Sequence, residues 1–208
     1  MNKVTTPSTK SGRRREVVKA AYSLIAEKGF EGLRTREVAT KVGINSATLH
    51  YYFPTKETLI QGVVEHLIDE LKTSRVVTDA STLATDRLRA EFSDIKVRLK
   101  EAPEQLVVLT ELALRAWRNP GIAQILKYLD QGWRQHLVSI FNAGIAEGTF
   151  RTGLDVEATA GAMMTQLRGL GYQGNLAPEK LSGLVDQICL QVEHWVSAAQ
   201  KTKKVKRP

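Results

Sequence analysis

Cysteine is almost absent from this sequence: Cys189 is the single one among 208 residues. A disulfide within the chain needs two cysteines and a thiolate metal centre needs several, so both are excluded. Because its neighbours are Ile188 and Leu190, we expect the Cys189 thiol to be a small buried filler. The four histidines are dispersed along the chain and do not cluster at metal-ligand spacing: His50, His66, His136 and His194. We therefore predict no metal and no cofactor.

Long apolar runs are also absent. No segment approaches the roughly 20 consecutive apolar residues that a membrane-spanning helix needs. Residues 1–15, MNKVTTPSTKSGRRR, are polar and basic, and no apolar stretch typical of a secretory signal follows them. Hydrophobic residues make up 42% and charged residues 25%, as in ordinary globular proteins. We expect a globular protein of the cytoplasm.

The sequence lacks a set of residues that predicts catalysis. An enzyme of this kind needs a nucleophile beside a base, or an acid and a base in one cleft. Glu111 and His136 are the one pair that we considered, and a hydrogen-bonded core histidine is the simpler interpretation of His136. Residues 169–174 match the letters GxGxxG, but they follow a predicted helix and not a strand, so they do not indicate a dinucleotide site. We predict that the protein is not an enzyme and has no catalytic residues.

Positive charge is present, and it is unevenly distributed. Residues 1–56 hold eleven Lys or Arg against four Glu, a net charge of +7, whereas residues 57–200 hold fourteen against eighteen acids, a net charge of −4. Residues 201–208 add five more positive charges. A solvated charged face is the simpler alternative, but it would not separate the signs so sharply. A basic head on a mildly acidic body is typical of a nucleic-acid-binding domain joined to a sensor or dimerisation domain.

Apolar residues recur with the period of an α-helix. Val18, Ala21, Tyr22 and Ile25 fall at i, i+3, i+4 and i+7 in a segment that Gly29 closes as a helix C-cap. No segment alternates with period two, so we expect no β-sheet. The helices predicted beyond the head, three of which begin beside a proline, are 82–101, 103–118, 120–147, 155–172 and 178–199. The predicted fold class is all-α, with about nine helices in total.

Two short helices joined by a tight turn lie inside the basic head. Thr35 is placed to cap a helix that stops at Gly43, and Asn45 is placed to cap a second helix that Pro54 ends. Thr55 is placed to cap a longer helix with an apolar residue at every fourth position. Helix, turn and helix in a basic segment predict a DNA-binding unit. The predicted organisation is a disordered basic arm (1–11), a helix-turn-helix domain (12–55), a helical body (56–200) and a basic tail (201–208).

The helix-turn-helix segment carries a recognisable pattern of residues: Gly43, Ile44, Asn45, Thr48, Leu49, Tyr52, Phe53, Lys56, Glu57 and Leu59. With these residues, the segment 12–65 resembles the tetracycline-repressor (TetR) family of regulators. The family's pattern is a helix, a Gly-containing turn and a T-L-Y-x-Y-F-like helix, followed by K-E-x-L. One departure is His50, which stands where the family usually has tyrosine. The resemblance implies a three-helix N-terminal DNA-binding domain and a helical C-terminal domain for ligand binding and dimerisation.

The expected DNA contacts follow from exposure and from the resemblance. Leu49 and Phe53 lie four residues apart and should be buried, which leaves the polar side chains of their helix for DNA. By resemblance, Thr35 and Lys56 would meet phosphates, and Arg36 would reach a guanine edge. The expected DNA-binding residues are Thr35, Arg36, Ser46, Thr48, His50, Tyr51, Tyr52 and Lys56. Arg13–Arg15 are additional phosphate contacts, a minor-groove arm or a solvated face.

The resemblance also implies a ligand pocket among the middle helices. The candidate lining residues are large apolar or amphipathic side chains: Phe92, Leu109, Leu112, Trp117, Tyr128, Trp133, His136, Phe141, Met163 and Gln166. Most of them are expected to be simple core. Because they include few charges, we expect a small, largely apolar effector.

The last two helices are expected to form a homodimer by packing as a four-helix bundle, as the resemblance implies. Two segments carry suitable side chains at helical spacing: Met163, Met164 and Leu167, and Leu184, Ile188, Gln191, Val192 and Trp195. An intramolecular core is the alternative. A symmetric dimer would match a palindromic operator in double-stranded DNA.

These expectations together predict a sequence-specific transcription regulator. The most plausible mode is a repressor that a small molecule releases from its operator, and repression is expected only because it is usual in the family. The alternative is a DNA-binding protein of the same fold that no small ligand controls, acting with a protein partner or as an architectural protein.

Overall fold

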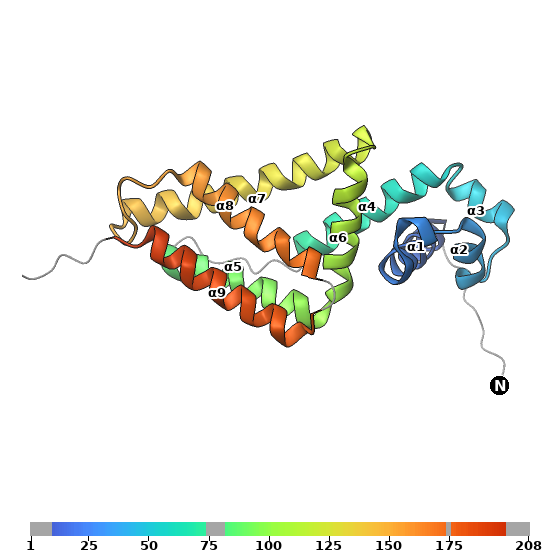
Figure 1. The fold of residues 1–208 in the computed structure, drawn as a ribbon. Helices are drawn as coiled ribbons and strands as arrows, with labels where there is room; N and C mark the ends of the chain where they lie inside the picture. The colour runs from blue at the N-terminus through green and yellow to red at the C-terminus, as the bar shows by residue number, and fades with distance from the viewer. Residues whose placement is uncertain (1–9, 74–81, 174–175, 199–208) are drawn as a thin grey trace, which may run out of the picture. The chain divides into compact units, whose positions relative to one another are not determined.

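The computed structural model describes residues 10–73, 82–173 and 176–198 (Figure 1). These residues form nine α-helices and one 3-10 helix, and among them extended structure is limited to an isolated bridge between Phe150 and Ser197. In chain order the elements are α1 (Lys10–Gly32), α2 (Thr35–Val42), α3 (Ser46–Tyr52), α4 (Lys56–Thr73), α5 (Ala84–Glu101), α6 (Pro103–Ala116), α7 (Pro120–Ala146), α8 (Val156–Gly169), η1 (Leu170–Gln173) and α9 (Pro178–Val196). The all-α prediction is confirmed.

The described residues belong to two compact units. The head unit lies within Met1–Arg75 and Ala102–Lys127 and contains α1 to α4, α6 and the start of α7. The body unit lies within Val76–Glu101 and Tyr128–Pro208 and contains α5, the remainder of α7, α8, η1 and α9. The domain boundary at residues 55 and 56 stays a prediction. No helix among the described residues is long and apolar enough to cross a membrane.

The head unit is built around α1. This helix packs against α2, α4 and α6. The buried residues of α1 include Val17, Ala21, Leu24 and Ile25, and the same core includes Leu59, Val63 and Leu67 of α4 and Val108 and Leu112 of α6. Burying one large aliphatic side chain stabilises a fold by about 1.5–3 kcal/mol. This core therefore stabilises α2 and α3, which have eight and seven residues and are too short to be helical by themselves.

The body unit packs α5 and α8 against α9. Its core is formed by apolar side chains from all four helices, among them Phe92, Leu137, Phe141, Met163 and Val185. Gly144 in α7 permits one close approach, because a Cβ atom there would lie 2.1 Å from Cδ2 of Phe150. The loop after α7 therefore folds back onto the helix.

The helices predicted beyond residue 82 agree with the structure to within three residues at each end. Three local expectations were wrong. First, α1 begins at Lys10, so Lys10 and Ser11 are helical and not part of the arm, whose other residues lie outside the described ones. Second, Thr35 is itself helical, and the N-cap of α2 is Arg34, whose side chain accepts no capping hydrogen bond.

The third wrong expectation is the burial of Cys189. Its side chain is half-buried, because its position on α9 lies at the edge of the packed face, beside the exposed Leu190. Its thiol is nonetheless partly withdrawn from water, and this burial raises the pKa of Cys189 above its usual value. The basic tail 201–208 lies outside the described residues.

Candidate nucleic-acid interface

The turn between α2 and α3 is held by backbone and side-chain hydrogen bonds. Gly43 adopts the left-handed conformation with φ 71°, and its N–H donates to the carbonyl of Thr40 at 3.1 Å. Asn45 then caps α3, because its side-chain oxygen accepts from the backbone N–H of Thr48 at 2.8 Å. The predicted end of α2 at Gly43 and the predicted N-cap role of Asn45 are confirmed.

Helix α3 is amphipathic in the way that the sequence predicted. Leu49 and the residue after the helix, Phe53, are each 1% exposed. The predicted contact residues of α3 remain accessible: Ser46, His50 and Tyr51 are exposed, and Thr48 and Tyr52 are half-buried. Packing on one side thus leaves hydroxyl, imidazole and phenol groups on the other, as DNA reading requires. Their contacts with DNA stay predictions.

Lys10 joins this exposed face from α1. Its ammonium nitrogen lies 5.0 Å from the centroid of the Tyr51 ring, and that ring meets Tyr52 edge-on at 5.3 Å. A hydrogen bond to the Tyr51 side chain raises the pKa of Lys10, so the ammonium stays charged. The sequence reading missed Lys10, although the basic run that follows it was a signal for charge near the interface.

The other cations of the head differ in whether an acid neutralises them. Four make ion pairs: Lys28 with Glu37, Lys41 with Glu27, Arg13 with Glu16, and Arg14 with Glu65. By contrast, Arg36 is exposed in the first turn of α2 and makes no ion pair with a described acidic side chain, as is also true of Arg15, Lys19 and Arg34. The guanidinium donors of Arg36 are therefore not occupied by a described acidic side chain, and its contact with a nucleic acid stays a prediction.

Lys56 has a protein partner that the sequence did not suggest. Its ammonium nitrogen lies 3.3 Å from the backbone carbonyl oxygen of Phe30 and donates to it. The side chain is half-buried at the start of α4. An ammonium has three donors, so a phosphate contact by Lys56 is compatible with this bond and stays a prediction. Thr35 lies half-buried at the first position of α2.

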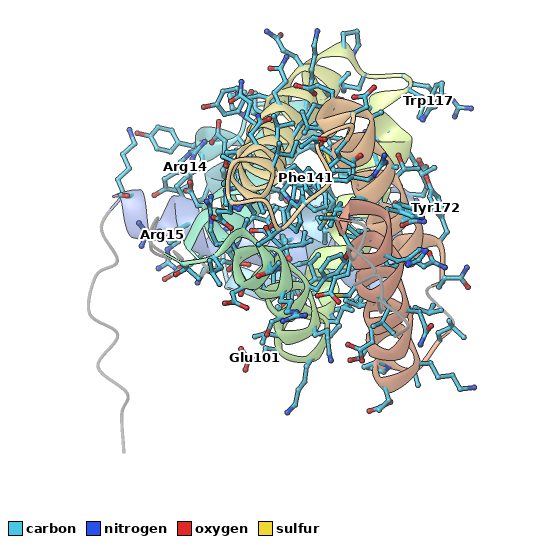
Figure 2. The ribbon with its side chains drawn as sticks, turned by 90° about the vertical axis from the view of Figure 1, so that its left-hand side faces the viewer. Arg14, Arg15, Glu101, Trp117, Phe141 and Tyr172 are labelled. Atoms are coloured by element: carbon cyan, nitrogen blue, oxygen red, sulfur yellow. The ribbon has the colours of Figure 1, made fainter. Side chains whose placement is uncertain are left out.

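The ten candidate pocket residues are divided between the two units, and their contact with a ligand stays a prediction. Leu109 and Leu112 pack in the core of the head unit, and Trp117 and Tyr128 are 89% and 65% exposed. In Figure 2, Trp117 projects into solvent, whereas Phe141 lies among side chains inside the body unit. The six residues that lie in the body unit and are buried or half-buried are Phe92, Trp133, His136, Phe141, Met163 and Gln166.

A buried carboxylate that sequence reasoning missed lies beside two of these residues. Glu91 of α5 is 6% exposed, and its two carboxylate oxygens accept from Nε1 of Trp133 at 3.2 Å and pair with Nε2 of His136 at 2.7 Å. The available signal was position, since Glu91 falls between Leu88 and Phe92 on the apolar stripe of its helix. His136 is thus hydrogen-bonded within the body unit, as expected for a structural histidine.

Glu111 and His136, the candidate acid–base pair, each have a different hydrogen-bond partner. The carboxylate of Glu111 accepts from the backbone N–H of Phe30 at 3.1 Å, while His136 pairs with Glu91. Within the described residues no group of three or more His, Cys, Asp or Glu side chains is placed to hold a metal ion.

Two family models match this chain. Residues 17–63 match the bacterial regulatory proteins of the tetR family, and residues 84–198 match the C-terminal region of BetI-type transcriptional repressors. The N-terminal match contains α2, α3, most of α1 and the start of α4, and the C-terminal match contains α5 to α9.

Individual relatives agree with the family matches. The chain is 27% identical over 153 residues to the HTH-type transcriptional repressor KstR2 of Mycolicibacterium smegmatis, covering 73% of this chain and 74% of that protein. It is 32% identical over 120 residues to the nucleoid occlusion factor SlmA of Vibrio vulnificus, covering 57% and 53%. A solved structure of a transcriptional regulator from Saccharomonospora viridis in complex with choline shares the fold, with a TM-score of 0.79, 21% identity and coverage of 91% of this chain and 100% of that one.

Proposed function

Because this chain belongs to the TetR family of bacterial transcription regulators, we propose that it is a dimeric repressor whose operator binding is relieved by a small molecule held in the body unit. The chain is a transcriptional regulator and not an enzyme. Its site of action would be the cytoplasm, where bacterial operators lie. The single observation that carries the DNA-binding part is the geometry of α3, a capped helix with a buried apolar side and an exposed polar side.

The proposed DNA contacts divide by chemistry. Arg36 has an unneutralised guanidinium at the start of α2 and suits the O6 and N7 atoms of guanine. Thr35 and Lys56 suit phosphates, and the exposed groups of α3 suit base edges in the major groove. The residues assigned to base edges are Ser46, Thr48, His50, Tyr51 and Tyr52. Lys10, beside Tyr51, adds a phosphate contact at the same face.

The proposed dimer uses the exposed side of α9. Leu184, Ile188, Gln191 and Trp195 recur at i, i+4, i+7 and i+11 and are exposed or half-buried. In contrast, Met163, Met164, Leu167 and Val192 are buried inside the body unit and belong to its own core. We expect Leu184→Arg to convert a dimer into a folded monomer in light scattering. If the variant keeps the mass of the wild-type dimer, the proposal that α9 forms the dimer interface is wrong.

The proposed effector is apolar with one hydrogen-bonding or positively charged group. Phe92, Phe141 and Met163 supply the apolar surroundings, and Gln166 contributes a buried side-chain oxygen that has no hydrogen-bond partner among the described residues. Glu91 adds a carboxylate to this set, and Trp133 and His136 hold it in place. A solved structure with the same fold is in complex with choline, which supports an effector with a cationic group. A carboxylate and an indole ring close together also favour an organic cation.

The test begins with selection of operator DNA from a randomised duplex pool at physiological salt. An enriched palindrome is expected, with affinity lost in Arg36→Ala. Organic cations and neutral apolar compounds are then added to the preformed complex. Release by a cation in the wild type, but not in Glu91→Gln, supports the proposed effector class. No enrichment in the selection would overturn the operator-binding part, and tight binding that no compound relieves would favour a repressor without small-molecule control.

A further inference from the structure

The backbone of a single residue, Phe30, is held by side chains from two other helices. Its N–H donates to Oε2 of Glu111 in α6 at 3.1 Å, and its carbonyl oxygen accepts from Nζ of Lys56 in α4 at 3.3 Å. Its ring is 3% exposed and lies 5.2 Å from the guanidinium of Arg115, one turn after Glu111 in α6. The N–H of Phe30 is thus bound by a carboxylate, and its carbonyl oxygen is bound by an ammonium group. We refer to Glu111, Phe30 and Lys56 as the Phe30 clamp.

The clamp acts where the chain changes direction between α1 and α2. Gly29 departs from helical geometry with φ 68° and ψ 177°, which frees the N–H of Phe30 from the hydrogen-bond ladder of α1. A Cβ atom on Gly29 would lie 3.3 Å from Oε2 of Glu111, so the carboxylate is packed directly against this turn. The N–H of Phe30 therefore donates its hydrogen bond to a side chain that lies 81 residues away in the sequence, on another helix.

The turn at Phe30 lies at the start of the helix-turn-helix. Phe30 near the end of α1 and Leu33 in the connection are both buried, and α2 begins two residues after Leu33. Lys56 stands at the first position of α4, directly after the segment that ends α3. The clamp therefore links α6 to both boundaries of the helix-turn-helix, the entry through Phe30 and the exit through Lys56.

We propose that Glu111 is a positioning residue for DNA binding: its carboxylate connects α6 to the helix-turn-helix through the backbone of Phe30. Glu111 lies in the matched C-terminal region, whereas Phe30 and Lys56 lie in the matched N-terminal region. A displacement of α6 that withdraws the carboxylate leaves a buried N–H without a partner and loosens the turn before α2. The inference rests on the proposed function only in that operator binding is its main readout.

The experiment compares two variants of Glu111 with one control on the same helix. Glu111→Leu removes the acceptor, Glu111→Gln keeps an oxygen that can accept from Phe30, and Glu104→Gln removes a charge from the first turn of α6. Operator affinity is measured by fluorescence anisotropy, and amide hydrogen exchange is measured over residues 27–34. We expect Glu111→Leu to lose about tenfold in affinity and to exchange the Phe30 amide faster, Glu111→Gln to lose less, and Glu104→Gln to match the wild type.

Two outcomes would overturn the proposal. One is wild-type affinity together with wild-type exchange in Glu111→Leu. The other is an equal loss of affinity in all three variants, which would reflect the charge of α6 and not the hydrogen bond. If Glu111→Leu does not fold, Glu111→Gln carries the same comparison with a smaller effect. If the wild type selects no operator, the proposed function fails, and the exchange of the Phe30 amide still decides whether Glu111 holds the turn.

Discussion

The cap of α3 offers a direct test of how this short helix is kept ready for DNA. Asn45→Ala removes the side-chain oxygen that accepts from the N–H of Thr48 at 2.8 Å. Loss of an N-cap of this kind costs about 1 kcal/mol, within a range of roughly 0.5–2 kcal/mol. Because α3 has seven residues and little intrinsic stability, most of this cost should fall on the helix itself. The melting temperature should decrease by roughly 2–4 °C for a chain of this size.

The cost reappears in operator affinity. A cost of about 1 kcal/mol corresponds to about a fivefold loss of affinity if DNA binding must restore the helix. Circular dichroism melting and anisotropy titration measure the two effects. Asn45→Ser is the matched control, since serine caps helices about as well as asparagine. The reasoning is refuted if the alanine and serine variants have equal stability and equal affinity.

Three further predictions concern other parts of the chain. Gly144→Ala should lower the free energy of unfolding by about 1–3 kcal/mol in urea titration, because the new Cβ would overlap Phe150, and an unchanged midpoint would contradict this packing. Lys56→Met should weaken operator binding and reduce the slope of log affinity against log salt by about 0.9, and an unchanged slope would exclude a phosphate contact by Lys56. Burial raises the pKa of Cys189, so less thiolate is present at pH 8 in the folded protein. The reaction of Cys189 with a disulfide reagent should therefore be slower in the folded than in the unfolded protein. Equal rates would show that the thiol is accessible.

Local signals in the sequence predicted the helices well, since each signal acts over a few residues. Gly43 favours the left-handed turn, Asn45 caps the helix after it, and Pro54 disfavours continuation of α3. Thr35 is the exception, because it is the first residue of α2 and not its N-cap. The two positions differ by one residue, and local preference does not separate them.

Burial of the candidate pocket residues was predicted less well, because composition does not say which face of a helix is covered. Trp117 was chosen for its size and apolar ring, yet it is 89% exposed. Glu91 is not among the candidates, yet it is buried and hydrogen-bonded to Trp133 and His136. A charged side chain becomes tolerable inside a protein when donors surround it, and those donors come from another helix.

The sequence alone determined the all-α fold, the helix-turn-helix and the basic character of the head, because periodicity, caps and charge are properties of neighbouring residues. Only the tertiary structure decided which side chains meet across long separations. The contact of Glu111 with Phe30 and the placement of Lys56 on the same peptide both depend on how α1, α4 and α6 pack in the head unit. Such contacts join residues whose spacing along the chain carries no pattern, since packing brings them together only when the helices have formed.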